Sequence, residues 1–274
     1  MLPLDVTVLN YALTLEHLEN AFYHGALEKF SEQAFVDAGM PGFARRRFEQ
    51  VAAHEATHVK FLSTALGDKA TQPCTYNFPY TDVRSFAALS QILEGVGVST
   101  YTGAAQFISN KEYLTAAASI LATEARHESW VSSAINRFAG WSGAFDVPLG
   151  LNEVFTLAAP FITECPTTNP VLPVHPFPKL VLHSPSPGQP THIVWADNDA
   201  RGATHIAFYT GLNVIPVPIQ DGSVVVPADV DGTVYAVAIT SDSDANDSTI
   251  VAGPAILLFE RNSNNVLIES SQAN

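Results

Sequence analysis

The sequence predicts an α+β chain of more than one domain, in which a four-helix bundle precedes a small antiparallel β-sandwich. Three observations predict this fold class. Apolar residues recur at helical spacing in the N-terminal part of the chain, a helical hairpin occurs twice there, and short β-branched segments replace the helical period beyond residue 165. We expect a bundle over residues 1–165, a proline-rich linker over 166–190 and a β-module over 191–274, with 179 as an alternative start of the module.

The duplicated hairpin is the most specific of these observations. Residues 51–66 align without a gap on residues 120–135, and internal repeats of this kind indicate duplicated structural units. Each copy has a glutamate followed three residues later by a histidine, and residues three apart lie on the same face of a helix. The two pairs are Glu55 with His58 and Glu124 with His127.

The helix before each of these copies repeats a second pattern. Glu16 is followed seven residues later by Tyr23, and Glu94 is followed at the same spacing by Tyr101. Seven residues are close to two helical turns, so each phenol lies on the face of its glutamate. Glu19 shares that face, but glycine stands at the equivalent position of the second copy, so we expect Glu19 beside the site or in solvent.

Together the four helices provide the residues of a dinuclear metal site. Two helices contribute one inward glutamate each and two contribute Glu-x-x-His, as in di-iron and di-manganese bundles. Carboxylate and imidazole ligands suit Fe or Mn, and Zn could also bind, so two divalent ions are the expected cofactors. The predicted ligands are Glu16, Glu55, His58, Glu94, Glu124 and His127. Tyr23 and Tyr101 are predicted catalytic residues that hydrogen-bond a ligand carboxylate, with plain core aromatics as the alternative.

The helical elements follow from capping residues and periodicity. The first helix begins near Asp5, the third begins at Thr81 or Asp82, and a polar connection covers residues 31–40. The other predicted helices span 41–66, 111–139 and, as a short fifth helix interrupted by Pro160, 151–162. His54 precedes Glu55 directly, so we expect it to face elsewhere as a surface or packing histidine.

The β-module is predicted from short segments bounded by Gly, Pro, Asp and Asn. Seven such segments suggest an antiparallel sandwich of the immunoglobulin type, although the cysteine pair and tryptophan of antibody domains are missing. The segments span 179–184, 191–197, 204–209, 214–219, 223–227, 233–240 and 255–260. Histidines in this part lack the spacing of a metal site, so the ligand of the module stays unassigned.

The composition argues against two classes of partner. The 274 residues carry a formal net charge of −14 with only 13 lysines and arginines, so nucleic acid is not an expected partner. No apolar run approaches the ~20 residues that cross a bilayer, so we expect no membrane partner.

The two cysteines, Cys74 and Cys165, each lie in a proline-flanked loop just after one of the hairpins. Such loops lie at the same end of a bundle, so a disulfide is predicted, with two free thiols as the alternative. A disulfide implies an oxidising compartment, and the glycosylation sequon at Asn246 points the same way. We therefore expect an extracellular or secretory location, with the cytoplasm as the open alternative.

These motifs resemble those of the ferritin-like superfamily. The resemblance rests on residues 15–23, on Glu94 and on the two Glu-x-x-His motifs, and it covers about residues 4–162. The chain is most similar to the branch of plant desiccation-related proteins and fungal stress-response or late sexual development proteins. The resemblance implies the same six ligands, with Glu55 and Glu124 bridging two metals.

The ligand pattern does not specify one activity, because ferroxidases, peroxide reductases, oxygenases and dimanganese catalases share it. Our first hypothesis is an oxidoreductase of a stress or developmental context, in which Fe or Mn reacts with O2 or hydrogen peroxide. The oxidant is expected on the Glu16 and Glu94 side, beside Tyr23, Gly97 and Tyr101. The alternative is a non-catalytic stress-response protein that binds a glycan or protein and uses the bundle as a scaffold. A homodimer is compatible with either hypothesis.

Overall fold

The structure is a computed structural model that describes residues 4–196 and 199–273. Four long helices precede antiparallel sheets along the chain, so the predicted α+β fold class is confirmed. The chain divides into two compact units whose segments alternate in sequence. The first unit comprises Met1–Arg137 and Ala158–Pro173, and the second comprises Phe138–Leu157 and Val174–Asn274.

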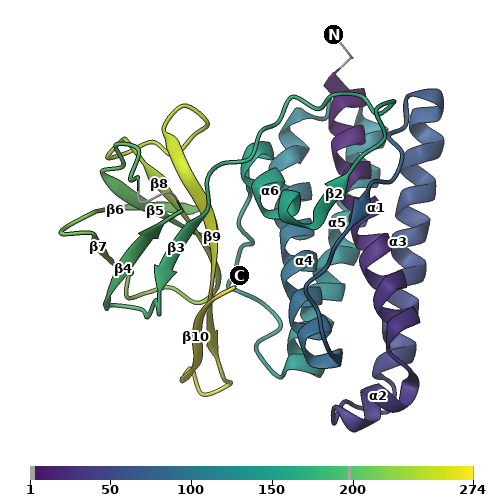
Figure 1. Ribbon diagram of the computed structural model, residues 1–274, viewed down its shortest axis with the longest axis horizontal. Coiled ribbons are helices and arrows are strands. Elements are labelled where there is room, and N and C mark those ends of the chain that lie inside the picture. Colours follow the sequence, from purple (N-terminus) through teal and green to yellow (C-terminus); the bar gives the residue numbers. More distant parts are fainter. Residues whose placement is uncertain (1–3, 197–198, 274) are drawn as a thin grey trace. The chain divides into compact units, whose positions relative to one another are not determined.

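The first unit is a bundle of four long helices that lie side by side (Figure 1). They are α1 (Leu4–Lys29), α3 (Ala44–Leu66), α4 (Val83–Ala104) and α5 (Lys111–Trp130). An aromatic cluster fills one part of the space between them, and Phe22, Phe48 and Phe86 are fully buried there. Each of these rings contributes about 1.5–3 kcal/mol of burial free energy, so the cluster fixes how the helices align.

Local chemistry explains where the helices begin. Asp82 caps α4 by accepting a hydrogen bond from Ser85 N at 2.8 Å, and Asn110 Oδ1 accepts one from Glu112 N at 2.8 Å at the start of α5. Asp5 was expected to cap the first helix, but it lies within α1 and accepts a hydrogen bond from Ser109 N at 2.7 Å. Its carboxylate therefore fixes the turn before α5 instead.

Three predictions for the long helices and the connection between the first two need correction. The expected polar connection contains α2 (Glu32–Asp37), whose first turn is capped by Ser31. The second long helix begins at Ala44 rather than at residue 41, because a turn that bonds Ala44 N to Pro41 O precedes it. The helix expected to reach 139 changes at Val131 into a π-helical segment, Val131–Asn136, and ends where Arg137 adopts a left-handed conformation with φ 67°.

The predicted disulfide between Cys74 and Cys165 is present. Directly beside it, β1 (Thr75–Tyr76) pairs with β2 (Ile162–Glu164) in a two-stranded sheet. The chain after the first hairpin is thereby joined to the chain that follows α6 (Leu151–Ala158). Short 3-10 turns complete the connections: Gly67–Lys69, Ala105–Phe107 and Ala159–Phe161.

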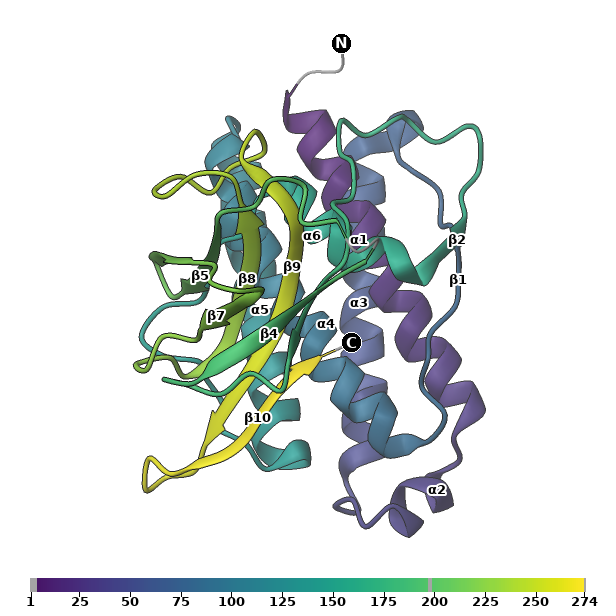
Figure 2. The same ribbon diagram turned by 60° about the vertical axis from the view of Figure 1, so that its left-hand side comes forward.

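The second unit contains two antiparallel sheets (Figure 2). Side chains from both sheets form one hydrophobic core. The larger sheet has the strand order β10-β9-β8-β5-β6, and the smaller has the order β3-β4-β7. The strands are β3 (Leu180–His183), β4 (Pro190–Trp195), β5 (His205–Thr210), β6 (Asn213–Pro218), β7 (Ser223–Val225), β8 (Gly232–Ile239), β9 (Ile250–Arg261) and β10 (Leu267–Ala273).

The strand predictions hold for seven of these elements and miss β10. Its sequence alternates poorly between apolar and polar residues, so it gives no clear strand signal, yet it pairs with β9 along the edge of the larger sheet. β6 lies at the other edge, which explains why it tolerates Pro216 and Pro218. The segment predicted over 191–197 ends at Asp197, outside the described residues.

Residues 138–157 belong to the second unit. Ser142 Oγ accepts a hydrogen bond from Thr233 N at 2.9 Å, and the neighbouring Gly232 has φ 63°. A Cβ at Gly232 would lie 2.3 Å from Ser142 Cα, so only glycine permits this approach. Asn152 and Thr156 of α6 accept hydrogen bonds from His175 N and Phe177 N. Part of the segment predicted as a linker is therefore bonded to α6.

The short fifth helix ends earlier than predicted, at Ala158, where the chain tightens into the 3-10 turn that contains Pro160. None of the helices in the described part of the chain is long and apolar enough to cross a membrane.

Candidate metal centre

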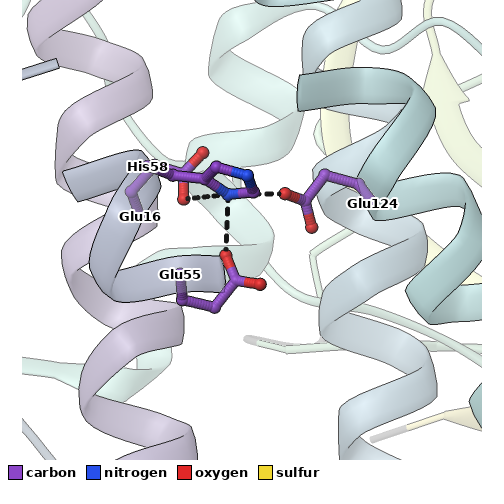
Figure 3. Close-up of side chains that lie close together, drawn as sticks. All are labelled: Glu16, Glu55, His58 and Glu124. Atoms are coloured by element: carbon purple, nitrogen blue, oxygen red, sulfur yellow. Dashed lines mark hydrogen bonds and ion pairs between the residues drawn. The ribbon is translucent and has the colours of Figure 1, made fainter. Parts of the chain in front are cut away.

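The six residues predicted as ligands lie together between the four long helices. They form two groups in which the potential ligand atoms lie within 4.8 Å of one another. The first group, drawn in Figure 3, contains Glu16, Glu55, His58 and Glu124. The second group contains Glu55, Glu94, Glu124 and His127. The four carboxylates are at most 1% exposed.

His58 has three carboxylates around one nitrogen. Its Nδ1 lies 3.0 Å from Glu124 Oε1, 3.2 Å from Glu55 Oε2 and 3.3 Å from Glu16 Oε2, as the dashed lines in Figure 3 show. One imidazole nitrogen carries at most one proton, which cannot serve three acceptors. A cation among these oxygens can, because it accepts several ligands at once.

His127 stands in a matching position in the second group. Its Nδ1 lies 3.2 Å from Glu55 Oε1, 3.3 Å from Glu94 Oε2 and 3.5 Å from Glu124 Oε2. Glu55 and Glu124 therefore each direct one oxygen toward His58 and the other toward His127. This is the arrangement that bridging carboxylates require.

The unsatisfied oxygens of the cluster test whether the residues fit metal ions. Glu16 Oε2, Glu55 Oε1 and both carboxylate oxygens of Glu124 are buried without a well-formed hydrogen bond. A buried polar atom without a partner is costly, and a buried charge without a counter-charge is more so. Four carboxylates carry four negative charges and two divalent cations carry four positive ones, so two ions would satisfy the oxygens and neutralise the cluster. The residues of the cluster therefore fit two divalent metal ions.

The pKa directions show how the cluster balances its charge in the metal-free state. Burial raises the pKa of Glu16 to about 8, although the nearby His58 imidazole acts to lower it. Burial also favours neutral Glu124, but the nearby imidazoles of His127 and His58 outweigh it and lower the pKa of Glu124 to about 2. Burial disfavours a charged His127, yet its carboxylate partners raise the pKa of His127 to about 12. Metal ions would therefore displace protons from the histidines.

The two tyrosines hydrogen-bond the outer carboxylates in a crossed pattern. The Tyr23 hydroxyl donates to Glu94 Oε1, and the Tyr101 hydroxyl donates to Glu16 Oε1. Both rings are buried. Each phenol thus orients the glutamate of the other hairpin, and its predicted part in catalysis stays a prediction.

Glu19 corrects two expectations. It is buried at 5% exposure, so the alternative that placed it in solvent is wrong. A Cβ at Gly97 would lie 3.1 Å from Glu19 Oε1, so the Glu19 carboxylate lies beside Gly97, where the oxidant was expected. Burial raises the pKa of Glu19, and the nearby carboxylates add to this rise.

His54 was expected to be a surface or packing histidine that faces away from the site. It is exposed as expected, but the expected direction is wrong. Its Nδ1 lies 2.9 Å from His127 Nε2, and the two rings stack with their centroids 5.1 Å apart. The contact links α3 to α5, so no spacing within either helix could reveal it. A hydrogen bond to the second nitrogen of a ligating histidine fixes its tautomer and ring orientation.

The class of this bundle follows from its helices and its carboxylate and histidine cluster. Residues 4–137 match the family of the ferritin-like domain, so this part of the chain is a ferritin-like domain. The chain is also similar to Protein rds1 of Schizosaccharomyces pombe, with 30% identity over 184 residues. That match covers 66% of this chain and 45% of the yeast protein, so the chain spans less than half of this relative.

Proposed function

We propose that the ferritin-like domain holds two divalent ions, Fe or Mn, and acts as an oxidoreductase on O2 or hydrogen peroxide. One observation carries the proposal: two histidine-centred groups share Glu55 and Glu124 and leave four buried carboxylate oxygens without a hydrogen bond. Bound Fe or Mn would supply the electrons for reduction of the oxidant, which the side chains themselves cannot do.

The chain's own residues would hold and orient this centre. Glu55 and Glu124 reach both groups, while Glu16 and Glu94 each belong to one. Tyr23 and Tyr101 hold the outer carboxylates by hydrogen bonds, which limits how far these groups can rotate. Burial of the carboxylates excludes water and raises the strength of every charge interaction in the cluster.

The experiment is to load the purified chain with Fe(II) or Mn(II), add O2 or hydrogen peroxide, and follow peroxide consumption and the optical spectrum. We expect a spectral change with at least one metal and one oxidant. Glu55→Ala should abolish it, whereas Glu112→Ala, an exposed acidic residue of α5, should not. A fully loaded protein that responds to neither oxidant would overturn the proposed reaction and leave only a metal-binding protein.

A further inference from the structure

A cavity of about 580 Å³ opens between α3 and α5, on the histidine side of the candidate metal centre. His58 and His127 form part of its lining, so a molecule inside it contacts the residues predicted to hold the metals. Its volume is in the range of small-molecule sites. On the side where the oxidant was expected, Tyr23, Gly97 and Tyr101 are buried.

Two arginines place positive charge at the cavity. Arg47 of α3 and Arg126 of α5 line it, and its lining contains no aspartate or glutamate. Both guanidinium groups bond neutral partners, Arg47 to Gln50 Oε1 at 2.6 Å and Arg126 to Thr123 Oγ1 at 3.3 Å. Neither arginine belongs to an ion pair of the described residues. In a chain of net charge −14, two such cations at one opening favour an anionic ligand.

His54 adds a hydrogen-bonding imidazole to the same cavity. Its Nδ1 lies 2.9 Å from His127 Nε2, and its ring lines the cavity together with the two arginines. The other ring nitrogen, Nε2, makes no hydrogen bond within the described part of the chain and can bond a ligand.

The remaining walls are partly apolar. Val51 and Trp130 belong to the lining, and Trp130 offers a flat ring against which an organic body can pack. Guanidinium groups bind carboxylates through paired hydrogen bonds with better geometry than a point charge provides. The cavity therefore combines oxyanion donors with an apolar wall.

We propose that this cavity binds a small organic carboxylate, whose carboxylate group contacts Arg47 and Arg126 and whose apolar body packs on Trp130. The ligand lies on the histidine side of the metal centre. Its role as a substrate rests on the proposed function, whereas its binding depends only on the cavity. Inorganic phosphate offers the same oxyanion chemistry without an apolar body, so it distinguishes the two kinds of ligand.

The test is calorimetric titration of the full chain, metal-free and metal-loaded, with benzoate, benzamide and inorganic phosphate. Benzoate should bind about tenfold more tightly than its uncharged isostere benzamide, and more tightly than phosphate. The double variant Arg47→Gln, Arg126→Gln should lower benzoate affinity about tenfold or more, since hydrogen bonds to charged groups have this strength. Arg46→Gln is the matched control, because Arg46 is adjacent on α3 and lies outside the cavity.

Equal binding of benzoate and benzamide, or unchanged benzoate affinity in the double variant, would overturn the proposal. If phosphate binds as tightly as benzoate, the proposal that the ligand has an apolar organic body is wrong. The far-UV circular dichroism of the variants shows that the helices are retained. Failure of the proposed function gives a different result. The metal-loaded protein would then show no redox response, while its benzoate binding would still depend on the two arginines.

Discussion

The two hairpins of the bundle, α1 with α3 and α4 with α5, have the same ligands but different surroundings. Each supplies one glutamate, one Glu-x-x-His pair and one tyrosine, and each tyrosine bonds the glutamate of the other hairpin. The neighbouring positions differ. Glu19 corresponds to glycine, His54 corresponds to Thr123, and Thr57 corresponds to Arg126.

The comparison separates two tasks. Residues present in both hairpins surround the predicted metal positions, and a duplicated unit that provides them twice can form a two-fold site. Residues present in one hairpin lie around that site and make it asymmetric. Glu19 fills the side near Gly97, while His54 and Arg126 line the cavity on the histidine side.

The largest effect on stability is expected from removal of the disulfide that joins the chain after the first hairpin to the chain after the second. The Cys74–Cys165 disulfide closes a chain segment with a sequence separation of 91. In the loop-entropy model, replacing both cysteines by alanine should destabilise the bundle by about 4–5 kcal/mol. Chemical unfolding followed by the helical circular dichroism signal measures this. An unchanged midpoint, or two alkylatable thiols in the unreduced protein, would contradict the prediction.

A second prediction concerns His54 and Thr123, which occupy equivalent positions. His54→Ala should lower metal affinity by about 10- to 100-fold, because His127 loses the partner that fixes its orientation. Thr123→Ala should change the affinity by less than about twofold, because Thr123 hydrogen-bonds Ser119 and Arg126, and neither of these is a predicted ligand. His54→Gln should restore part of the loss, since an amide oxygen can accept from His127 Nε2. Metal affinity is measured by competition with a chelating dye. Equal losses of affinity in His54→Ala and Thr123→Ala would show that the two positions are equivalent and would contradict the prediction.

A third prediction concerns Tyr23 and Tyr101, which make equivalent hydrogen bonds to the glutamate of the other hairpin. Tyr23→Phe and Tyr101→Phe each leave a buried carboxylate oxygen without its donor, which costs about 1–3 kcal/mol. We expect the two variants to lose similar amounts of stability, to retain both metals and to react with oxidant at altered rates. Unfolding midpoints and metal content provide the measurement. A loss confined to one variant would show that the crossed hydrogen bonds are not equivalent.

The smallest effect is expected at Glu19 and depends on pH. Burial raises its folded-state pKa, so the folded metal-free protein binds a proton that the unfolded chain has released above about pH 4.5. Its contribution to stability is therefore present at low pH and declines as pH rises toward the folded-state pKa. Glu19→Gln should reduce this decline, so the variant gains stability relative to wild type as pH increases. The measurement is the free energy of unfolding as a function of pH for both metal-free proteins. Parallel curves would show that the pKa of Glu19 is not raised in the folded state.

The sequence predicted those parts of the site that depend on one helix at a time. The three-residue spacing of Glu55 to His58, repeated at Glu124, identifies four of the six clustered residues. The repeated seven-residue offset of a glutamate to a tyrosine identifies the other two, Glu16 and Glu94. Contacts between helices were not predictable in the same way. The His54 pairing with His127 and the burial of Glu19 depend on how α1, α3, α4 and α5 approach one another.

The same distinction applies to the fold. The long helices and seven strands follow from periodicity, whereas β10 has a weak alternation and forms by pairing with β9. Residues 138–157 carry no signal that assigns them to the second unit; the Ser142 contact with Gly232 and Thr233 does so. The change to π-helix at Val131 likewise has no counterpart in the apolar pattern.

The central claim is that the buried cluster is a two-metal site shared equally by the hairpins. Its most direct test is metal content per chain, measured by elemental mass spectrometry after loading and removal of excess metal. We predict two ions per chain in the wild type and in Glu112→Ala, and a loss of both ions in Glu55→Ala and in Glu124→Ala, because each carboxylate reaches both histidine groups. Two ions retained in either bridging variant, or none bound by the folded wild type, would contradict the account.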